Sequence, residues 1–411
     1  MKQLILCFIV ILLVQARYSH GQTWEPLDDQ LQATVYSATA LNGEIYIGTS
    51  NAVMQYNGNR FDVIGRFNSK VLHLGTFNNE LYAAGAFTQI DGNTINGIAR
   101  WDGVSWHPLG TGVSPQASFF IEYNDELYVT GSITIAGDIS VSNIARWNGS
   151  EWSNVGSGLN GVGNKMEVHN SELFVLGTFS QAGGQDANNI ARWDGAAWRP
   201  VSTGLTYYSS PFYTNIKSFN NKLFVSEGFS INNDFFDMAI WDNNNWTFKY
   251  SHIPIMIVKS DTMYAMSTAS AGEVYKSSDG DNWKLINHVT HIDTLFPNGL
   301  FFIDNKLYAY GSVYTDFDNL RQNHGMVRYK LDPITGIINH KGPTDLTIQA
   351  YPNPVTDILR FESHMNQIEV FNAQGMSVAR YQQVSEISMA ELPAGVYLIR
   401  SGKKQIRVVK L

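Results

Sequence analysis

Three segments of the chain carry residue types that could hold a ligand. Aromatic rings can stack on sugar rings, while carboxylates and amides can hydrogen-bond sugar hydroxyls. Such residues gather where the chain departs from its surrounding pattern. One segment covers residues 232–237, and the other two supply the candidate binding residues Tyr207, Tyr208, Tyr213, Tyr314, Asp316, Asp318 and Arg321. Their composition is equally compatible with variable loops.

Catalytic and metal chemistry find no comparable support in the sequence. His288, His291 and Asp293 form one cluster, but residues three apart on a strand point to opposite faces, so a metal site would require a loop. A surface turn is the favoured interpretation. A glycosidase needs two carboxylates at a fixed separation, and the acidic residues single out no pair. The sequence contains no nucleophile-elbow, zinc-protease or phosphate-loop motif. A non-enzymatic protein without metal or cofactor is therefore favoured.

The segments that must position these residues are repeats. A short anchor, an apolar residue followed by Tyr or Phe, recurs 36 to 50 residues apart. Its copies begin at Ile45, Leu81, Leu127, Leu173, Leu223, Met263 and Leu307. Such a period, with alternating strands and glycine turns in each unit, is typical of β-propeller blades.

Each unit accounts for four strands. The anchor strand is followed by Ile-Ala-Arg-Trp, an Asp-Gly or Asn-Gly turn and a strand that opens with Trp, most clearly from Ile98, Ile144 and Ile190 onward. Asp-Gly and Asn-Gly favour tight hairpin turns, because both central residues need positive φ. The repeat therefore predicts an all-β protein built on a seven-bladed β-propeller.

One arginine recurs at the same place in four units, at Arg100, Arg146, Arg192 and Arg328. These side chains could converge on the central channel as an anion site. Alternatively, each could pack on a neighbouring Trp or bond a carbonyl between blades. Recurrence in repeat register favours the second, structural interpretation.

The last unit lacks its closing Trp strand. Residues 23–27 match the Trp strands at residues 105–109 and 197–201. We infer that residues 23–27 complete the last blade, so that the propeller spans residues 22–336. Closure of this kind removes exposed sheet edges.

At the Ile-Ala-Arg-Trp-Asp-Gly repeats the chain resembles the kelch-like and Asp-box propellers of secreted bacterial proteins. Residues 277–283 are similar to an Asp box but are one residue short between Asp279 and Gly280. The resemblance implies architecture and no activity, since Asp boxes are folding elements of the blade periphery. A copper-radical oxidase on such a scaffold would need a cysteine, and none follows residue 21.

The first 21 residues predict a secretory signal peptide. A charged start is followed by an apolar run from Leu4 to Val14 and by small residues at Ser19 and Gly21. The run is too short to span a membrane. Cys7, the single cysteine, lies inside this segment, so the mature chain is expected to hold together without disulfides and without a membrane span.

The charge of the repeat region limits its partners. Residues 22–346 carry 19 basic and 31 acidic side chains, a net charge of −12. This balance argues against nucleic acid or an anionic membrane surface. It is compatible with neutral or cationic ligands, or simply with solubility.

A different module follows the repeats. Residues 337–346 have the composition of a linker. Residues 347–411 predict six or seven short strands in a small immunoglobulin-like β-sandwich. An ordinary immunoglobulin-like binding domain is the alternative.

Residues 347–411 strongly resemble the type A C-terminal sorting domain of the type IX secretion system of the Bacteroidota. The motif residues are Tyr351, Pro352, Asn353, Pro354, Leu392, Pro393, Gly395, Val396, Tyr397 and Lys410. The resemblance implies export by the signal peptide, recognition by the outer-membrane translocon as a partner, and removal of the domain with surface attachment or release.

These features favour a secreted or cell-surface binding propeller with a glycan or protein ligand at one face of the ring. A polysaccharide-acting hydrolase would instead show a deep acidic pocket with two facing carboxylates. A structural adhesin would show an exposed apolar patch.

Overall fold

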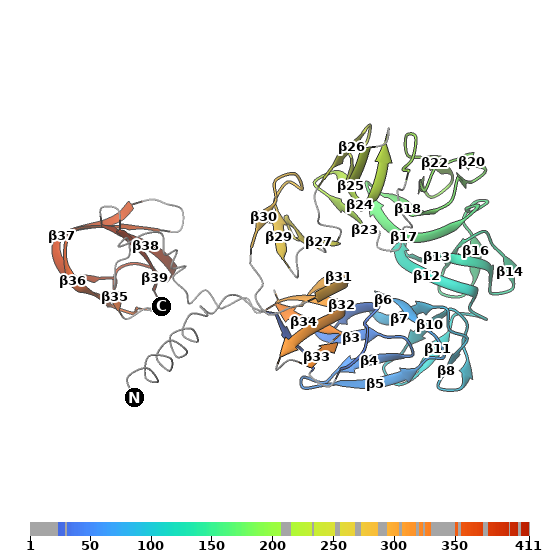
Figure 1. Ribbon diagram of the computed structural model, residues 1–411, viewed down its shortest axis with the longest axis horizontal. Helices are drawn as coiled ribbons and strands as arrows, with labels where there is room; N and C mark the ends of the chain where they lie inside the picture. Colours follow the sequence, from blue (N-terminus) through green and yellow to red (C-terminus); the bar gives the residue numbers. More distant parts are fainter. Residues whose placement is uncertain are drawn as a thin grey trace, which may run out of the picture. The chain divides into compact units, whose positions relative to one another are not determined.

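The computed structural model describes most of the chain as β-strands and turns (Figure 1). The described residues are 24–28, 31–206, 215–231, 234–250, 255–267, 273–286, 294–303, 306–317, 320–323, 325–329, 350–351, 355–372, 377–393, 395–401 and 404–410. The chain divides into two compact units, Met1–Leu331 and Asp332–Leu411. Every regular element in the described ranges is a strand.

The first unit contains seven sheets whose four principal strands are antiparallel, and we call them blades 1 to 7 in chain order (Figure 1). The innermost strands are β2 (Ser37–Leu41), β6 (Val71–Phe77), β12 (Val113–Tyr123), β17 (Val162–His169), β23 (Asn215–Phe219), β27 (Ile255–Lys259) and β31 (Thr294–Ile303). The second strands are β3 (Glu44–Gly48), β7 (Glu80–Gly85), β13 (Glu126–Ala136), β18 (Glu172–Thr178), β24 (Lys222–Ile231), β28 (Thr262–Met266) and β32 (Lys306–Phe317).

The outer half of each blade holds the Ile-Ala-Arg-Trp and Trp strands. The third strands are β4 (Ala52–Tyr56), β10 (Ile98–Trp101), β15 (Ile144–Trp147), β21 (Ile190–Trp193), β25 (Asp234–Trp241), β29 (Val274–Ser277) and β34 (Met326–Tyr329). The outermost strands are β5 (Phe61–Arg66), β11 (Trp106–Pro108), β16 (Trp152–Asn154), β22 (Trp198–Pro200), β26 (Trp246–Lys249), β30 (Lys284–Leu285) and β1 (Trp24–Pro26). Short extra strands are β8 (Gln89–Ile90), β9 (Asn93–Thr94), β14 (Ile139–Ser140), β19 (Gln181–Ala182), β20 (Gln185–Asp186) and β33 (Leu320–Asn323).

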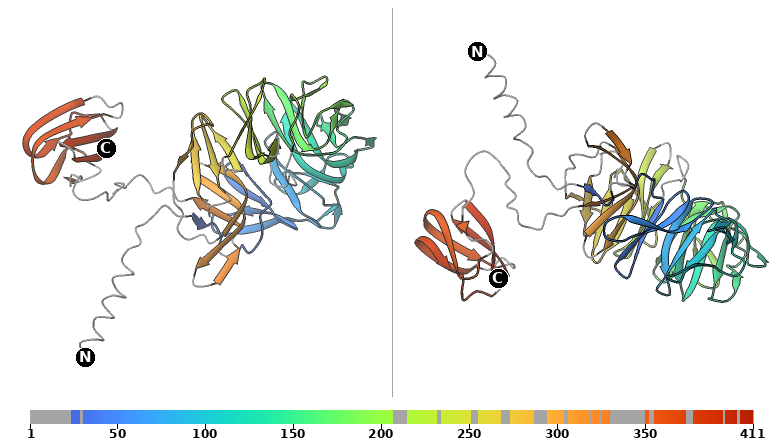
Figure 2. Two further views of the ribbon diagram at one scale, coloured as in Figure 1. Left: turned by 45° about the horizontal axis from the view of Figure 1, so that its top comes forward. Right: turned by 90° about the horizontal axis from the view of Figure 1, so that it is seen from below.

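The seven innermost strands form a closed ring. Each one contacts the innermost strand of the next blade, and β31 contacts β2. The blades also remain side by side in the further views of Figure 2. This arrangement is a seven-bladed β-propeller, as the repeat predicts.

Blade 7 takes its outermost strand from near the start of the chain. Trp24 of β1 pairs with Tyr329 of β34. The following segment adds a backbone hydrogen bond from Leu27 N to Met326 O at 3.3 Å and another from Val35 N to Gly311 O at 3.0 Å. Backbone pairing thus joins the first and last strands of the propeller unit.

Tryptophans join neighbouring blades. In blades 2 to 5 the third and outermost strands present a tilted Trp pair with ring centroids 5.2–5.4 Å apart. The outer Trp also donates its indole N–H to a carbonyl of the preceding blade. Trp106 reaches Ile64 at 3.1 Å, and Trp152 and Trp198 reach Leu109 and Val155 at 2.8 Å.

Three of the four recurring arginines have a carboxylate as their partner. Arg100, Arg146 and Arg192 each form an ion pair with a glutamate on the second strand of the same blade. The nitrogen–oxygen distances to Glu80, Glu126 and Glu172 are 2.6, 3.0 and 2.9 Å. The arginines are therefore neutralised within their blades.

The turn before each Trp strand is stabilised by an Asp or Asn side chain. In blade 4, Asp194 accepts the backbone N–H groups of Ala196 and Ala197 at 2.9 and 2.7 Å. These bonds, aided by Arg199, lower the pKa of Asp194 to about 2. Asp279 makes the same contacts in the turn that resembles an Asp box, with backbone bonds from Asp281 and Asn282.

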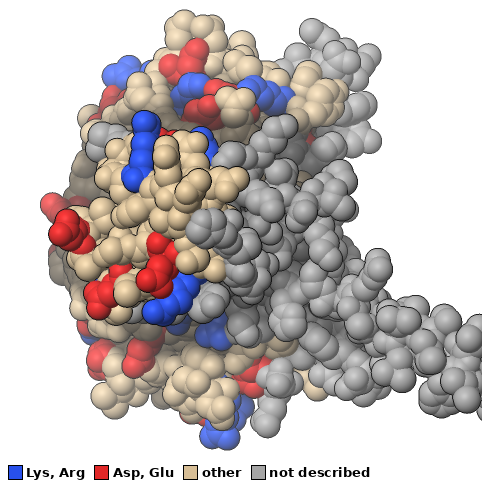
Figure 3. All heavy atoms as spheres, turned by 90° about the vertical axis from the view of Figure 1, so that its left-hand side faces the viewer, with Lys and Arg blue, Asp and Glu red and all other residues tan. Residues whose placement is uncertain are grey.

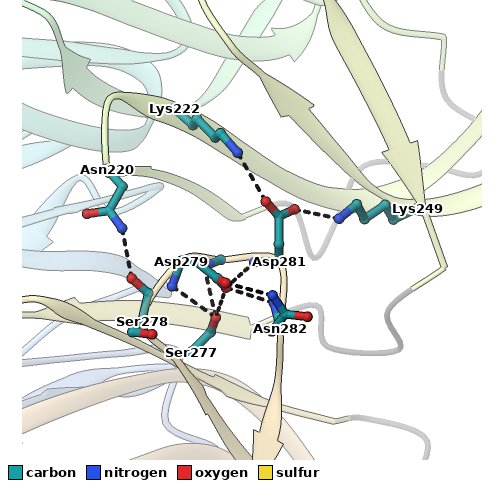
Figure 4. A network of polar contacts seen from close by, with 9 residues as sticks. Asn220, Lys222, Lys249, Ser277, Ser278, Asp279, Asp281 and Asn282 are labelled. Carbon is teal, nitrogen blue, oxygen red and sulfur yellow. Dashed lines mark hydrogen bonds and ion pairs between the residues drawn. The ribbon is translucent and has the colours of Figure 1, made fainter.

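Blades 5 and 6 are joined by a polar network in addition to apolar packing that includes Trp283 (Figure 4). Asp281, in the blade 6 turn, accepts Lys222 at 3.1 Å and Lys249 at 2.5 Å, both from blade 5. Asn220 also donates to the carbonyl of Ser278 at 2.8 Å. Among the described residues, ion pairs and an amide hydrogen bond thus stand at this boundary where other boundaries have an indole hydrogen bond.

The second unit is one five-stranded sheet with a compact core. Its strands are β35 (Ala350–Tyr351), β36 (Ile358–Phe371), β37 (Ser377–Ser388), β38 (Gly395–Ser401) and β39 (Lys404–Lys410). The long β36 changes its neighbour on one side from β35 to β38 along its length, and Val355 forms a parallel bridge with Lys410. The sheet therefore curls around the buried residues, and two long strands stand where the sequence predicted several short ones.

The indole bonds between blades predict a graded loss of stability. Trp198→Phe removes the indole donor from the carbonyl of Val155, which still accepts the backbone N–H of Gly158 at 3.0 Å, and should cost about 0.5–1.5 kcal/mol. Trp246→Phe is the matched control, because its indole reaches the Val201 carbonyl only at 3.5 Å. Calorimetric melting should therefore give a clearly lower midpoint for Trp198→Phe than for Trp246→Phe. Equal shifts would contradict a role for the hydrogen bond.

Candidate binding site on the inner strands

Several of the residues that the sequence proposed for binding lie outside the described part of the chain. These are Tyr207, Tyr208, Tyr213 and Asp318, together with the His288, His291 and Asp293 cluster. Tyr314 and Asp316 lie on β32 and Arg321 lies on β33, where Asp316 and Arg321 are register partners. This segment is therefore a β-hairpin that lengthens blade 7, rather than a loop.

The second symmetry-breaking segment is also a hairpin. Of residues 232–237, the described residues 234–237 begin β25, and Ile231 at the end of β24 pairs with Asp234. Blades 5 and 7 thus carry extended hairpins. A lengthened hairpin keeps its backbone hydrogen bonds, which explains why these insertions remain strands.

A candidate site lies on the innermost strands, which in propellers surround a central channel. The residue seven positions before each anchor is apolar in every blade, from Leu74 in blade 2 to Leu300 in blade 7. The residue eight positions before the anchor differs in every blade. These residues are Ser37, His73, Phe119, Lys165, Asn215, Ile255 and Gly299, and each lies at the same register position of its sheet.

A β-bulge precedes this variable position in four blades. The pairing shifts by one residue just before His73, Phe119, Lys165 and Gly299. Bulges re-aim side chains and are frequent beside functional sites. The backbone therefore departs from regular pairing where the side chains also depart from the repeat.

The variable positions of blades 2 to 4 are in contact. His73 stacks on Phe119, with ring centroids 3.9 Å apart and an interplanar angle of 27°. The ammonium of Lys165 lies 4.9 Å from the centroid of the Phe119 ring. A cation over an aromatic face is attracted to its electron-rich surface. The phenyl ring thus joins the imidazole to the ammonium group.

The neighbouring position adds two charged side chains. Lys217 of blade 5 forms an ion pair with Glu167 of blade 4 at 3.0 Å, and the backbone N–H of Ser218 donates to the other oxygen of Glu167 at 3.1 Å. We call His73, Phe119, Lys165, Glu167 and Lys217 the inner-strand cluster. It spans the inner strands of four consecutive blades.

The electrostatics of the cluster differ from those of the outer blades. Burial and the nearby charge of Lys217 lower the pKa of Lys165 to about 8. Burial, with the charges of Lys165 and Lys217, also holds the pKa of His73 well below its usual range, so the imidazole is neutral at pH 7. No carboxylate of the described residues forms an ion pair with Lys165. The site therefore combines one poorly compensated ammonium with a neutral imidazole.

A cavity of about 430 Å³ lies on the inner strands of the remaining blades. Its walls come from β2, β27 and β31 and include Thr39, Lys259 and Phe302. The Lys259 ammonium lies 4.6 Å from the centre of the Phe302 ring. A second lysine–aromatic contact therefore faces an open space on the inner strands.

One surface group resembles a catalytic triad in residue type only. His107 Nε2 lies 2.6 Å from Asp102 and 3.0 Å from Ser105 Oγ. A triad uses the two different ring nitrogens for these partners, so that one can accept the serine proton while the other is held. The sharing of one nitrogen rules out such a relay in this geometry. Among the described residues no group of His, Cys, Asp or Glu is arranged to hold a metal ion.

The described residues on the face drawn in Figure 3 form no large patch of one charge. On the face drawn in Figure 3, acidic and basic side chains are interspersed among uncharged ones. The large apolar side chains that are exposed on the propeller lie in separate blades, at Val63, Val104, Ile135 and Tyr250. The described surface thus offers no continuous apolar area to a partner.

The sorting-motif residues that the structure describes lie near the edge strands of the second unit. Gly395, Val396 and Tyr397 begin β38, and Lys410 ends β39. The buried Tyr397 donates its hydroxyl to the carbonyl of Pro393 at 2.8 Å. Tyr351 lies on β35, whereas Pro352, Asn353 and Pro354 lie outside the described residues. Leu392 donates its backbone N–H to Met389 at 3.1 Å. The motif is thus a structural part of this sheet.

Comparison with known families identifies the C-terminal module. Residues 349–411 match the family of secretion system C-terminal sorting domains. The chain therefore carries a type IX sorting domain, which indicates secretion to the cell surface. No curated protein matches the chain. None of the described residues forms a helix that is long and apolar enough to cross a membrane.

Two solved structures support the propeller fold, and a third aligns less closely. The extracellular domain of the one-component system BT4673 from B. thetaiotaomicron aligns with a TM-score of 0.51 and 14% identity, over 96% of this chain and 59% of that chain. A second structure, of the BT4673 hybrid two-component system, gives a TM-score of 0.50 and 12% identity over 96% and 60% of the two chains. PorZ, a surface component of the type IX secretion system of Porphyromonas gingivalis, aligns with a TM-score of 0.48 and 12% identity over 92% and 59%. The chain thus spans about three fifths of these proteins.

The electrostatics of the inner-strand cluster predict that Lys165 lowers the free energy of unfolding. Lys165→Met keeps the side-chain length and removes a charge that burial and Lys217 disfavour, so it should raise the free energy of unfolding at pH 7 by about 1–2 kcal/mol. The folded-state pKa is below the unfolded value of 10.5, so the gain should fade as pH rises from about 8 to 10.5. Melting curves at pH 7 and pH 9.5 would measure it.

Lys276→Met on the exposed part of β29 is the control and should change stability by less than about 0.5 kcal/mol. A clear loss of stability in Lys165→Met would contradict the electrostatic interpretation.

Proposed function

We propose that the protein is a carbohydrate-binding propeller that acts outside the cell after type IX export, and that it holds its ligand on the inner strands without transforming it. The observation that carries the proposal is the inner-strand lining. There the side chains vary from blade to blade, while the positions next to them keep the apolar pattern of the repeat. Repeat architectures are built from equivalent units, so a cluster of unequal polar residues has no explanation in the repeat itself.

Binding is favoured over hydrolysis by the contacts of Glu167. One oxygen of Glu167 accepts from Lys217 and the other from the Ser218 backbone. A general acid or nucleophile must reach the substrate with a carboxyl oxygen, at a fixed separation from a second carboxylate. Both oxygens of Glu167 are instead engaged by the protein.

A sugar ligand is favoured over a protein ligand by the distribution of apolar side chains on the described surface. Protein interfaces centre on clustered aromatic or apolar side chains, whereas the exposed apolar residues of the propeller are scattered over separate blades. The inner strands instead offer aromatic rings, a threonine hydroxyl and a lysine beside a space of about 430 Å³. We further propose that the extended hairpin of blade 7, with Tyr314, Asp316 and Arg321, contributes to ligand contact.

A glycan screen tests this function. The full chain, applied to an oligosaccharide array and to turnover assays on every oligosaccharide that binds, should bind a defined set and release no product. Turnover would replace binding by hydrolysis. Failure to bind any carbohydrate would overturn the proposed function.

A truncation tests export and location. A variant that ends at residue 348 lacks the matched sorting domain and should accumulate in the periplasm of a Bacteroidota host that has a type IX system. Fractionation and surface proteolysis would locate it. A variant with Lys276→Met in the full chain is the control and should reach the surface. Equal surface delivery of the truncated chain would contradict sorting by residues 349–411.

A further inference from the structure

The lysines of the inner strands differ in how their charge is balanced. Lys217 has Glu167 at 3.0 Å, and the outer-blade Lys222 and Lys249 share Asp281. Lys165 has an aromatic ring and another lysine as its neighbours, and forms no ion pair with any described carboxylate. An ammonium group that is half-buried beside a second ammonium is stabilised by any anion that enters between them.

The surroundings of Lys165 also contain an unsatisfied acceptor. Asn215 occupies the equivalent position of blade 5, and the pairing of Glu167 with Lys217 places the two strands so that Asn215 lies level with Lys165. The Asn215 Oδ1 atom is buried and accepts no hydrogen bond from the described residues. Buried oxygen atoms normally have a donor, so this atom can accept one from a hydroxyl group.

We propose that the inner-strand cluster binds the anionic group of an acidic oligosaccharide, with Lys165 as the principal cation, Lys217 as the second and Asn215 as the acceptor for a sugar hydroxyl. The inference rests on the proposed function and names its ligand class. A carboxylate and a sulfate ester share the required chemistry, since both present oxygens that accept charge-assisted hydrogen bonds from ammonium groups.

The net charge of the repeats by itself predicts that anionic ligands are disfavoured. A net charge of −12 favours neutral or cationic ligands, because the long-range field repels anions. That field is screened beyond about 8–10 Å at physiological salt, whereas contact with Lys165 acts at hydrogen-bond distance. The local cluster therefore decides the preference at the inner strands.

Matched oligosaccharides test the ligand class on the full chain. The probes are a uronic-acid oligosaccharide, its carboxyl-reduced neutral counterpart and a sulfated oligosaccharide of the same length, measured by titration calorimetry. At least one acidic probe should bind about tenfold or more tightly than the neutral one, because a charge-assisted hydrogen bond is lost on reduction. A preference for the carboxylate or for the sulfate would identify the anionic group.

Variants separate this inference from the proposed function. Lys165→Met should remove the acidic preference and Lys165→Arg should retain it, whereas the exposed control Lys276→Met should leave the binding of all three probes unchanged. Equal binding of acidic and neutral probes, or an acidic preference that survives in Lys165→Met, would overturn the anion site alone. Absence of binding to all three probes and to the wider array would overturn the carbohydrate function.

The pH dependence gives an independent readout. Besides Lys165, the titratable or charged groups on the packed inner strands are His73 on β6, Glu122 and Tyr123 on β12, Glu167 and His169 on β17, and Lys217 on β23. Lys165 loses its proton as pH rises through about 8, and His73 is already neutral at pH 7. The acidic preference should therefore fall between pH 7 and pH 9 in the unmodified chain and persist in Lys165→Arg, whose guanidinium stays charged. A preference unchanged at pH 9 in the unmodified chain would contradict the role of Lys165.

Discussion

The hydrogen bond from each outer tryptophan to the preceding blade is the contact on which the ring depends most directly. A blade buries only part of its apolar surface by itself, so a propeller is stable only when neighbouring sheets stack. The indole places a large ring in the space between blades, and its N–H satisfies a backbone carbonyl there. Without a cysteine after residue 21, such contacts and the pairing of β1 with β34 must hold the ring closed.

Because the blades must stack, neighbouring residues on the inner strands have different roles. The residue seven positions before the anchor packs between blades and is apolar throughout, because a polar group there would lose its water without gaining a partner. In blades 2 to 4 the residues on either side of it are half-buried and are released from that constraint. His73, Phe119 and Lys165 can therefore differ from one another although they occupy one register position.

Most of the fold follows from local sequence signals, whereas the inner-strand cluster does not. The anchors, the Asp-Gly turns and the Trp strands each report a local backbone preference, and together they predict seven blades correctly. The arginine ion pairs could be predicted only by also comparing the acidic residues of the units. Glu80, Glu126 and Glu172 each stand 20 residues before their arginine. Lys165 and Lys217 lie 52 residues apart and come close only because two blades stack, so composition pointed to the loops instead. Aligning the units on their anchors and comparing the position eight residues earlier would have exposed the cluster.

In the second unit the alternating pattern was correct, but it did not reveal that β36 continues through a bend between Arg360 and Met365.

The modular ring also explains how an unfavourable charge can be retained. In repeat architectures the stability is approximately a sum of unit and nearest-neighbour contributions, so the electrostatic cost at Lys165 is confined to the boundaries around blade 4. The boundary between blades 3 and 4 has an indole bond of 2.8 Å from Trp198 to Val155, whereas the bond from Trp246 to Val201 between blades 4 and 5 is 3.5 Å long. Between blades 4 and 5 the ion pair of Lys217 with Glu167 adds a second contact. The uncompensated lysine is therefore flanked by a short indole bond on one side and by an ion pair on the other, and the boundaries farther round the ring do not share its cost.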